Sequence, residues 1–416
     1  MTLTRRASIL GLVATSLATS LGACTGGAAR FNRVPEVQPG YRAVPDAAFD
    51  AWVAAFRARA KGISPATLNA AFRQAGYVPD VVARDRNQAE FSRSLEDYLA
   101  IAASDTRIAK GRAALVTYQA TLRAIEARYG VEAQVVAAIW GLESTYGERR
   151  GEVPVISALA TLAYDGRRGK FFEKQLLAAL RILQAGDVTP ARMTGSWAGA
   201  MGHTQFIPTS YLAYAVDFTG DGRRDIWGDD PSDALASTAA YLARSGWTRG
   251  QPWGAEVRLP AAFDQSLAGR KTRRNSRDWA AMGVRDITGG PLADHGAASV
   301  LLPAGPGGPA FMAYGNFNVI ARYNNSESYV IGVGHLSDRL LGRPAIQGRF
   351  PPDAAGMTMD QRKALQQRLT AAGYDTGGSD GVVGAKTRAA ISAWQSARGL
   401  PVTGQPDLAM LVRLGG

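Results

Sequence analysis

The chain has 416 residues, of which 46% are hydrophobic and 20% are charged. These fractions are normal for a soluble globular protein. The length exceeds what one ordinary core supports, so we expect two or three domains. Cys24 is the only cysteine, which excludes an internal disulfide and redox chemistry through a pair of cysteines.

The formal net charge is +12, which favours acidic partners such as nucleic acid, anionic lipid or an anionic cell-wall polymer. No block of Lys and Arg and no RNA-binding motif points to nucleic acid, so we predict no nucleic-acid partner. The three histidines are scattered along the chain. They lack the paired spacing of a zinc amidase or peptidase.

The amino terminus has the pattern of an export signal. Arg5 and Arg6 precede an apolar run over residues 9–21, which is too short to span a bilayer stably. The run ends in the letters L-G-A-C at Cys24, which resemble a bacterial lipobox, whose cysteine carries lipid after cleavage. We therefore predict a lipoprotein signal peptide over residues 1–23 and a lipid anchor on Cys24.

Residues 24–45 are rich in Gly, Pro and Ala without periodicity, and they are predicted to form a tether. Thr25 follows the cysteine, in place of the aspartate that is associated with retention at the inner membrane. We therefore expect a periplasmic protein that is lipid-anchored to the outer membrane.

The chain beyond the tether is predicted to be mainly helical, with one exception. Apolar residues recur at helical spacing from residue 46 to residue 129, and a further helix is predicted from Phe171 to Ala185. Residues 249–318 have Gly and Pro throughout and short alternating runs, which predict a small β-containing insert. Two amphipathic helices are marked by Phe49, Trp52, Val53 and Phe56, and by Leu95, Tyr98, Leu99 and Ala102.

The most informative stretch is A-I-W-G-L-E-S-T-Y-G at residues 138–147. Apolar residues at three- and four-residue spacings predict a helix here, with Glu143 pointing into its apolar face and Gly147 stopping it. Burial among apolar neighbours raises the pKa of a carboxyl. A carboxyl that stays protonated near neutral pH can donate a proton to a leaving oxygen, as in glycoside cleavage. The alternative is a half-exposed glutamate in the last helical turn.

Two further stretches have the composition of a carbohydrate groove. The first, S-W-A-G-A-M-G-H-T-Q-F-I-P-T-S at residues 196–210, has small residues that let the backbone approach a ligand, and it contains Ser196 and Gln205. Taken alone, a Gly/Ala-rich stretch with one Gln more often reflects tight packing than a binding site. The second, at residues 316–329, has R-Y-N-N-S at its centre, where aromatic rings stand beside amides.

Together and in this order, the three stretches resemble the lytic murein transglycosylase B family, over roughly residues 46–340. The resemblance implies a mainly α fold, with a lysozyme-like catalytic core and helical and small β subdomains, which we place at residues 46–345. Such enzymes cleave the MurNAc–GlcNAc β-1,4 bond of peptidoglycan without adding water, and they leave a 1,6-anhydro-MurNAc end.

The resemblance also implies a role for particular residues. Glu143 matches the family's single catalytic acid/base, which protonates the glycosidic oxygen and then takes the proton of the MurNAc C6 hydroxyl as that oxygen closes on C1. Phe171 stands where the family often has a tyrosine. The other positions that match the substrate groove are Ser196, Gln205, Asn324, Tyr98, Tyr241, Tyr323 and Tyr329.

A lone acid suits ring closure, because the substrate supplies the nucleophile. Two-carboxylate glycosidases need a second carboxylate about 5 Å away as a nucleophile, or roughly 6.5–9.5 Å away as a base. The motifs at residues 138–147, 196–210 and 316–326 contain no second acid, but Glu148, Glu152 and Asp165 lie near in sequence. A muramidase that adds water is therefore an alternative. A non-catalytic peptidoglycan-binding lipoprotein that kept the fold is another.

Residues 217–225, D-F-T-G-D-G-R-R-D, resemble the first half of an EF-hand loop, although Gly228 stands where such a loop usually has its last glutamate. The alternative is an Asp/Gly turn that binds no ion. No cofactor is expected for the chemistry itself. The candidate ligands of a structural Ca²⁺ are Asp217, Thr219, Asp221, Arg223 and Asp233.

The carboxy-terminal part follows a predicted linker over residues 346–358, and Thr358 with Gln361 forms a capping-box pattern at its start. Residues 359–416 resemble the peptidoglycan-binding domain type 1, a small three-helix module. Such a module raises the local concentration of the glycan at a tethered catalytic site. Its predicted core residues are Leu365, Leu369, Ala390, Ile391 and Trp394.

Overall fold

The structure is a computed structural model that describes residues 40–87 and 93–415. The predicted signal peptide, Cys24 and most of the predicted tether lie outside the described residues. These residues form two compact units, of which the first comprises residues 93–146 and 238–415 and the second residues 40–87 and 147–237. In the described ranges, no helix is both long enough and apolar enough to cross a membrane.

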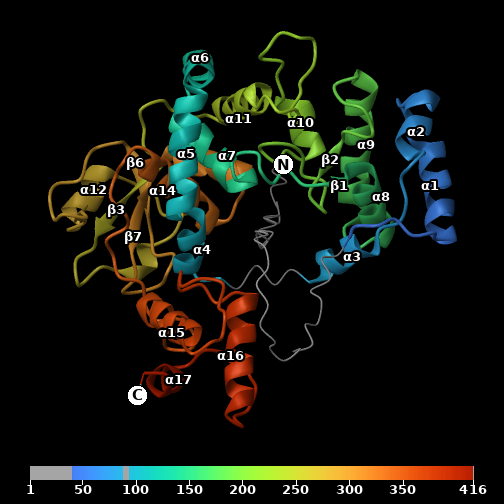
Figure 1. The fold of residues 1–416 in the computed structure, drawn as a ribbon. Helices are drawn as coiled ribbons and strands as arrows, with labels where there is room; N and C mark the ends of the chain where they lie inside the picture. The colour runs from blue at the N-terminus through green and yellow to red at the C-terminus, as the bar shows by residue number, and fades with distance from the viewer. Residues whose placement is uncertain (1–39, 88–92, 416) are drawn as a thin grey trace. The chain divides into compact units, whose positions relative to one another are not determined.

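The second unit is almost entirely helical (Figure 1). Its centre is the pair α8 and α9, which pack against each other and against α1, α2, α3 and α10. The amphipathic helix predicted at Phe49 and Phe56 is confirmed, because both rings are buried in α1. The elements are α1 (Ala47–Arg59), α2 (Pro65–Phe72), α3 (Pro79–Arg86), β1 (Val153–Pro154), α8 (Val155–Asp165), α9 (Gly169–Ala185), β2 (Thr194–Gly195) and α10 (Pro208–Tyr214).

The helical part of the first unit is built around α7, which packs against α14 and α5. Helix α11 (Ser232–Arg244) begins in the second unit and ends in the first. The helices of this part are α4 (Leu95–Ala102), α5 (Asp105–Thr117), α6 (Gln119–Tyr129), α7 (Ala133–Ser144), α13 (Gly315–Tyr323) and α14 (Glu327–Leu340).

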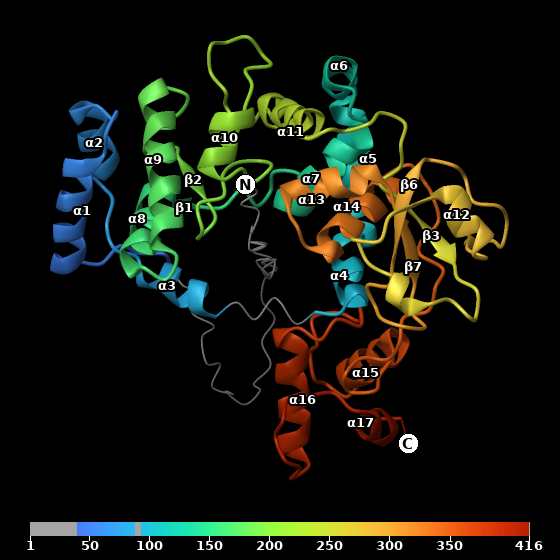
Figure 2. The same cartoon turned by 180° about the vertical axis from the view of Figure 1, so that it is seen from behind.

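The predicted β-containing insert is confirmed as a five-stranded antiparallel sheet in the order β4-β6-β7-β3-β5 (Figure 2). Its core is apolar and includes Trp279 and Met312, both fully buried. The register pairs Ser299 of β6 with Ala313 of β7. The elements are β3 (Gly254–Arg258), β4 (Arg274–Asn275), α12 (Ser276–Ala281), β5 (Arg285–Asp286), β6 (Ala297–Leu301) and β7 (Ala310–Ala313).

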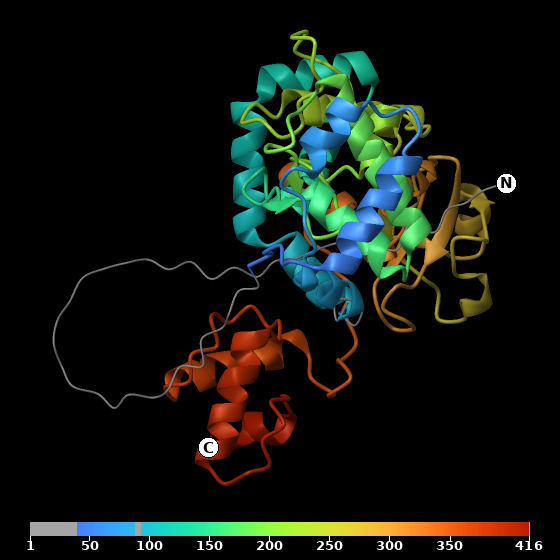
Figure 3. The ribbon, with the colours of Figure 1, turned by 90° about the vertical axis from the view of Figure 1, so that its right-hand side faces the viewer.

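The carboxy-terminal module has three helices, drawn in red in Figure 3. The predicted capping box is confirmed, because Thr358 and Gln361 each accept a hydrogen bond from the backbone of the other. All five predicted core residues are buried, as the helical spacing requires. The helices are α15 (Met359–Ala371), α16 (Ala385–Ala397) and α17 (Leu408–Arg413).

The predicted linker is bonded to Glu256 of β3 at its start and to itself near its end. The backbone amides of Gln347 and Gly348 donate to the carboxylate of Glu256 at 2.9 and 2.6 Å. At the other end, Asp353 accepts the Met357 amide at 2.9 Å. These bonds fix the backbone that leads into the module.

Candidate active site

The site is built on α7, which is buried on nearly all sides. Its apolar residues from Val135 to Leu142 are buried, including the alanines between the larger residues. A helix that is apolar all round belongs in a core, so the single apolar face predicted from the spacing understates the burial. Glu143 is the partly exposed residue near its end. The carboxyl therefore stands at the rim of a rigid, packed element.

Helix α7 ends immediately after Glu143, at Ser144, and not at Gly147 as predicted. The backbone turns at Thr145 and Tyr146, which have left-handed φ angles of 54° and 59°. Such angles are uncommon for residues other than glycine and carry strain. Two backbone hydrogen bonds hold the turn, from the Thr145 amide to the Gly141 carbonyl at 3.1 Å and from the Tyr146 amide to the Trp140 carbonyl at 3.4 Å.

The side chain of Tyr146 locks this turn against the helix. Its ring meets Trp140 edge-on, with the ring centroids 5.6 Å apart. A Cβ atom on Gly141 would lie 2.6 Å from the Tyr146 ring, and one on Gly111 of α5 would lie 2.2 Å from the Tyr146 hydroxyl. Glycine is therefore required at both positions for the ring to fit. The fit fixes the backbone that carries Glu143.

Tyr329 of α14 reaches the carboxyl directly. Its hydroxyl donates a hydrogen bond of 2.7 Å to Oε1 of Glu143, and its side chain is 0% exposed. Burial, and then the negative charge of Glu143, raise the pKa of the Tyr329 phenol well above its ordinary value. The phenol therefore stays protonated near neutral pH and acts as a donor.

Tyr98 of α4 lies on the same side of the first unit. Burial, and then the charge of Glu143, raise the pKa of its phenol, while Arg107 opposes the shift. A Cβ atom on Gly332 of α14 would lie 2.7 Å from the Tyr98 ring. The structure thus brings Tyr98, Tyr329 and Glu143 together in one cluster.

Tyr323, Asn324 and Tyr241 form a neighbouring group in the first unit. The rings of Tyr241 and Tyr323 meet at 5.0 Å between centroids, and the Tyr241 hydroxyl donates to the Arg322 carbonyl at 2.6 Å. Both rings are buried. Asn324 is also buried, and its side-chain carbonyl accepts the Ser326 amide at 3.1 Å. These side chains shape the loop after α13 more than they offer open ring faces.

The remaining groove positions lie in the second unit. The Ser196 hydroxyl accepts the Ala200 amide at 3.1 Å, which closes a tight turn. Gln205 has a left-handed φ of 52°, and its side-chain amide donates to the carbonyls of Arg150 and Gly202 at 2.9 and 2.8 Å. Phe171, at the start of α9, is 37% exposed.

The three acids weighed as a second carboxylate lie in the second unit as well. Asp165 forms an ion pair with Arg86. Glu148 and Glu152 are exposed. Glu148 and Glu152 therefore lack the apolar environment that prepares a carboxyl for acid–base chemistry, and the largely buried Asp165 is bound to a cation.

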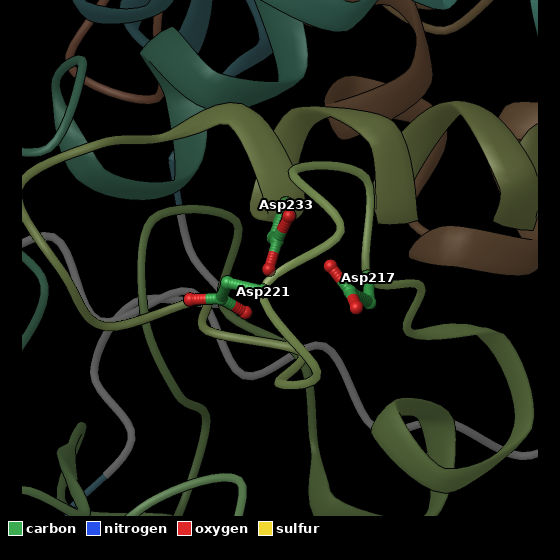
Figure 4. A group of neighbouring side chains, drawn as sticks. All are labelled: Asp217, Asp221 and Asp233. Atoms are coloured by element: carbon green, nitrogen blue, oxygen red, sulfur yellow. The ribbon is translucent and has the colours of Figure 1, made fainter.

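The acidic side chains of the EF-hand-like loop converge (Figure 4). Oxygens of Asp217, Asp221 and Asp233 all lie within 4.8 Å of one another. Asp233, at the start of α11, also accepts the amides of Phe218 and Thr219 at 2.9 and 3.1 Å. Thr219 is therefore oriented by its amide, and its hydroxyl donates to Asp217 at 3.4 Å.

This cluster fits a hard cation, because carboxylates that are brought this close repel one another unless a positive charge lies between them. Burial, and to a lesser degree the charge of Asp217, raise the pKa of Asp233. For Asp217, the amides of Gly222 and Gly220 outweigh desolvation, so its pKa is lowered. Arg223 takes part through its amide, which donates to Asp221 at 2.9 Å.

A mainly helical chain with a carboxyl at the end of a buried helix, a small sheet and a helical appendage has the architecture of lysozyme-like proteins that act on glycans. The chain belongs to the transglycosylase SLT domain family, whose sequence pattern matches residues 48–338. A second pattern, that of the putative peptidoglycan binding domain, matches residues 358–414. Both resemblances found in the sequence are thereby confirmed.

One relative is the membrane-bound lytic murein transglycosylase B of Escherichia coli (strain K12). It is 36% identical over 215 residues, which are 50% of this chain and 56% of that protein. The chain therefore aligns with little more than half of the length of this relative.

Solved structures match over more of the chain. SltB3 from Pseudomonas aeruginosa, in complex with NAG-anhNAM-pentapeptide, is 50% identical with a TM-score of 0.73, over 89% of this chain and 100% of that chain. The Escherichia coli lytic transglycosylase Slt35, in complex with calcium, is 29% identical with a TM-score of 0.61, over 72% and 94%. These likenesses confirm the predicted mainly α, lysozyme-like fold.

Proposed function

We propose that the chain is a lytic transglycosylase of peptidoglycan. It cleaves the β-1,4 bond between MurNAc and GlcNAc without adding water and leaves a 1,6-anhydro-MurNAc end. The observation that carries this proposal is the Glu143 carboxyl, which stands at the end of a buried helix and is oriented by the Tyr329 hydroxyl. The solved complexes of SltB3 with NAG-anhNAM-pentapeptide and NAG-NAM-pentapeptide support the same class of substrate.

In the proposed mechanism, one carboxyl serves both proton transfers. Protonated Glu143 donates its proton to the glycosidic oxygen as the bond from C1 to that oxygen breaks. The resulting carboxylate then removes the proton of the MurNAc C6 hydroxyl, and O6 forms the new bond to C1. The proton balance closes within the cycle, and no water is consumed. Tyr329 is fully buried and its hydroxyl is bonded to Glu143, so we assign it as a positioning residue.

We further propose substrate contacts for the positions that match the family's groove. Ser196 and Gln205 bond sugar hydroxyls or N-acetyl groups, and Phe171 offers its exposed ring to a sugar face. Tyr241, which is buried, supports the Tyr323 ring, and Asn324 shapes the loop that follows it. Tyr98 acts beside Glu143.

The place of the protein in the cell is also part of the proposal. The name of the Escherichia coli relative describes it as membrane-bound. In this chain, the lipobox pattern at Cys24 predicts a lipid anchor. We propose a periplasmic enzyme held at the outer membrane, with the module at residues 359–416 binding peptidoglycan. Ca²⁺ is proposed as a structural ion at Asp217, Asp221 and Asp233, consistent with the calcium complex of Slt35.

The test replaces Glu143 by Gln and measures the lysis of purified peptidoglycan. Loss of acid–base catalysis lowers the rate by about 10²–10⁴-fold, while binding to the wall is retained. Glu148→Gln is the matched control, because Glu148 is an exposed carboxylate close by in the sequence, and it lyses peptidoglycan at the wild-type rate. Equal lysis by Glu143→Gln and the control would contradict the proposal.

A further inference from the structure

The insert carries a dense group of positive charges. In the segment R-K-T-R-R-N-S-R at residues 270–277, five of the eight residues are Lys or Arg. We call this segment the basic strip. As a sequence it is not an uninterrupted block, because Thr272, Asn275 and Ser276 separate the cations. The structure shows why the segment acts as one feature.

The basic strip contains the edge strand β4 of the sheet and the residues on either side of it. Its strand β4 pairs with β6 on one side and is the last strand in the order of the sheet. Lys271, Arg273, Arg274 and Arg277 are all exposed. The four cations are therefore all exposed within one short segment, with Lys271 and Arg273 just before β4, Arg274 on β4 and Arg277 on α12.

Two of the guanidinium groups are held in place without being neutralised. Arg273 donates to the Ala297 carbonyl at 3.0 Å, and Arg274 stacks over the Trp279 ring at 5.7 Å. A carbonyl and an aromatic ring orient a guanidinium group but leave its full positive charge. The basic strip is thus preorganised for an anionic ligand, which lowers the entropy lost on binding.

Several arginines outside the basic strip form ion pairs with aspartates. Arg167 and Arg168 both pair with Asp85, and Arg224 pairs with Asp187. Within the described part of the chain, Lys271, Arg273 and Arg274 form no ion pair. Arg277 pairs with Asp294 at 3.3 Å, but the Arg277 side chain is 86% exposed. An ion pair this exposed contributes little free energy. Three exposed cations therefore lie in one segment without forming an ion pair to any described residue.

The basic strip begins at the proposed substrate loop. Arg270 donates to the side-chain carbonyl of Asn325 at 2.7 Å and to that of Asn318 at 3.3 Å. Asn325 directly follows Asn324, one of the positions that match the family's substrate groove. Both contacts and the basic strip belong to one compact unit, so the strip adjoins this loop at its Arg270 end.

We infer that the basic strip binds the carboxylates of the peptide stems of peptidoglycan. The sugars of the glycan are uncharged once the lactyl group of MurNAc is linked to a stem, and the anionic groups of the polymer are then the carboxylates of the stems. A planar guanidinium matches a carboxylate in two parallel hydrogen bonds. The inference rests on the proposed function, and it adds a second point of recognition beyond the cleaved bond.

The test compares a strip variant with a charge-matched control. The variant is Lys271→Gln/Arg273→Gln/Arg274→Gln, and the control neutralises three exposed cations of the second unit, in Lys61→Gln/Arg73→Gln/Arg181→Gln. The substrates are glycan strands with stems and the same strands after an amidase has removed the stems. On stem-bearing strands we expect KM of the strip variant to rise about tenfold with kcat unchanged. On stem-free strands, wild type, variant and control are expected to be equal.

Binding is measured separately, in proteins that also carry Glu143→Gln, so that the result does not depend on catalysis. Weaker binding of the strip variant to stem-bearing strands alone supports the inference, even if wild type releases no anhydro products and the proposed function fails. Equal binding of variant and control to both kinds of strand overturns it. So does a loss confined to vesicles that contain phosphatidylglycerol, since the basic strip would then be a membrane contact.

Discussion

The hydroxyl of Tyr329 donates a hydrogen bond of 2.7 Å to Oε1 of Glu143, and it joins residues that are 186 positions apart in the sequence. Glu143 comes from α7 and Tyr329 from α14, two helices that pack directly against each other. The orientation of the carboxyl therefore depends on the contact between these helices as well as on the end of its own helix. A hydrogen bond from a neutral donor also stabilises the ionised carboxylate relative to the protonated acid.

Tyr329→Phe removes this donor and keeps the ring. We expect the alkaline limb of the pH profile of kcat/KM to move upward, because ionisation of the carboxyl loses a stabilising partner. The rate at the optimum falls about tenfold as the carboxyl loses its orientation. Tyr241→Phe is the control, since its hydroxyl bonds a backbone carbonyl, and it leaves the profile in place. An unshifted profile in Tyr329→Phe would show that the bond does not act on the reacting group.

Gly141→Ala tests the turn that follows Glu143. The new methyl group would lie 2.6 Å from the Tyr146 ring, so the ring or the helix must move. We expect a loss of about 1–3 kcal/mol in the free energy of unfolding together with a lower kcat. Gly384→Ala, where no atom lies within 4 Å of the added group, is the control. A fully active and stable Gly141→Ala would contradict the account of this turn.

Arg362 joins the carboxy-terminal module to the helical part of the first unit. Its side chain is 2% exposed and forms ion pairs with Asp97 at 2.7 Å, Asp353 at 2.9 Å and Glu96 at 3.2 Å. The predicted linker is therefore not a free tether. Arg362→Met leaves three carboxylates without their cation, and we expect a cost of about 3 kcal/mol in the stability of the module.

Limited proteolysis measures this effect, because a loosened module exposes residues 346–358 to cleavage. Lys363→Met changes the neighbouring cation and serves as the control. Equal cleavage rates in Arg362→Met and Lys363→Met would show that the ion pairs do not hold the module.

His335 of α14 makes stability depend on pH. Burial, and then the positive charge of Arg339, lower its pKa from 6.5 to about 4. Between these values the unfolded chain binds the proton and the folded protein does not, so stability falls as the pH is lowered from about 7 to about 4. We expect His335 to account for about 2–3 kcal/mol of this fall.

Denaturant unfolding of wild type and His335→Gln at pH 7 and pH 4 checks the size of the effect. The variant loses less stability on acidification than wild type, while His295→Gln behaves like wild type. The same loss in wild type and His335→Gln would assign the acid sensitivity to other groups.

Calcium is expected to stabilise the second unit. Ca²⁺ at about a hundred times its dissociation constant raises the free energy of unfolding by about 2.7 kcal/mol, which appears as a higher Tm that a chelator reverses. Asp221→Asn removes one converging carboxylate and abolishes most of the gain, whereas Asp229→Asn, an exposed neighbour, keeps it. No change of Tm with Ca²⁺ in wild type would leave the cluster as a turn without an ion.

The helices with periodic apolar residues were predictable, because the spacing within one element is enough to predict its conformation and its buried face. The apolar spacing in α1, in α7 and in the carboxy-terminal module predicted those helices and their buried residues. The end of α7 was not predictable in this way, since the left-handed turn at Thr145 depends on where the Tyr146 ring packs. Glycine is the usual residue at such a turn, which is why Gly147 was expected to stop the helix.

Contacts between distant segments could not be predicted from spacing. The bond from Tyr329 to Glu143, the burial of Tyr241 beside Tyr323 and the ion pairs of Arg362 all join elements far apart in the chain. The basic strip is a different case. Its residues are adjacent in the sequence, but only the structure shows that four of its cations are exposed. A count of Lys and Arg in short windows would have found it.

The central claim is that Glu143 cleaves the glycan by ring closure, without water. The most direct measurement is mass spectrometry of the muropeptides that residues 25–416 release from purified peptidoglycan, before and after treatment with borohydride. The account predicts products lighter by one water than the hydrated muropeptides and resistant to reduction. Reducible MurNAc ends would contradict it and would identify a hydrolase that uses a second carboxylate.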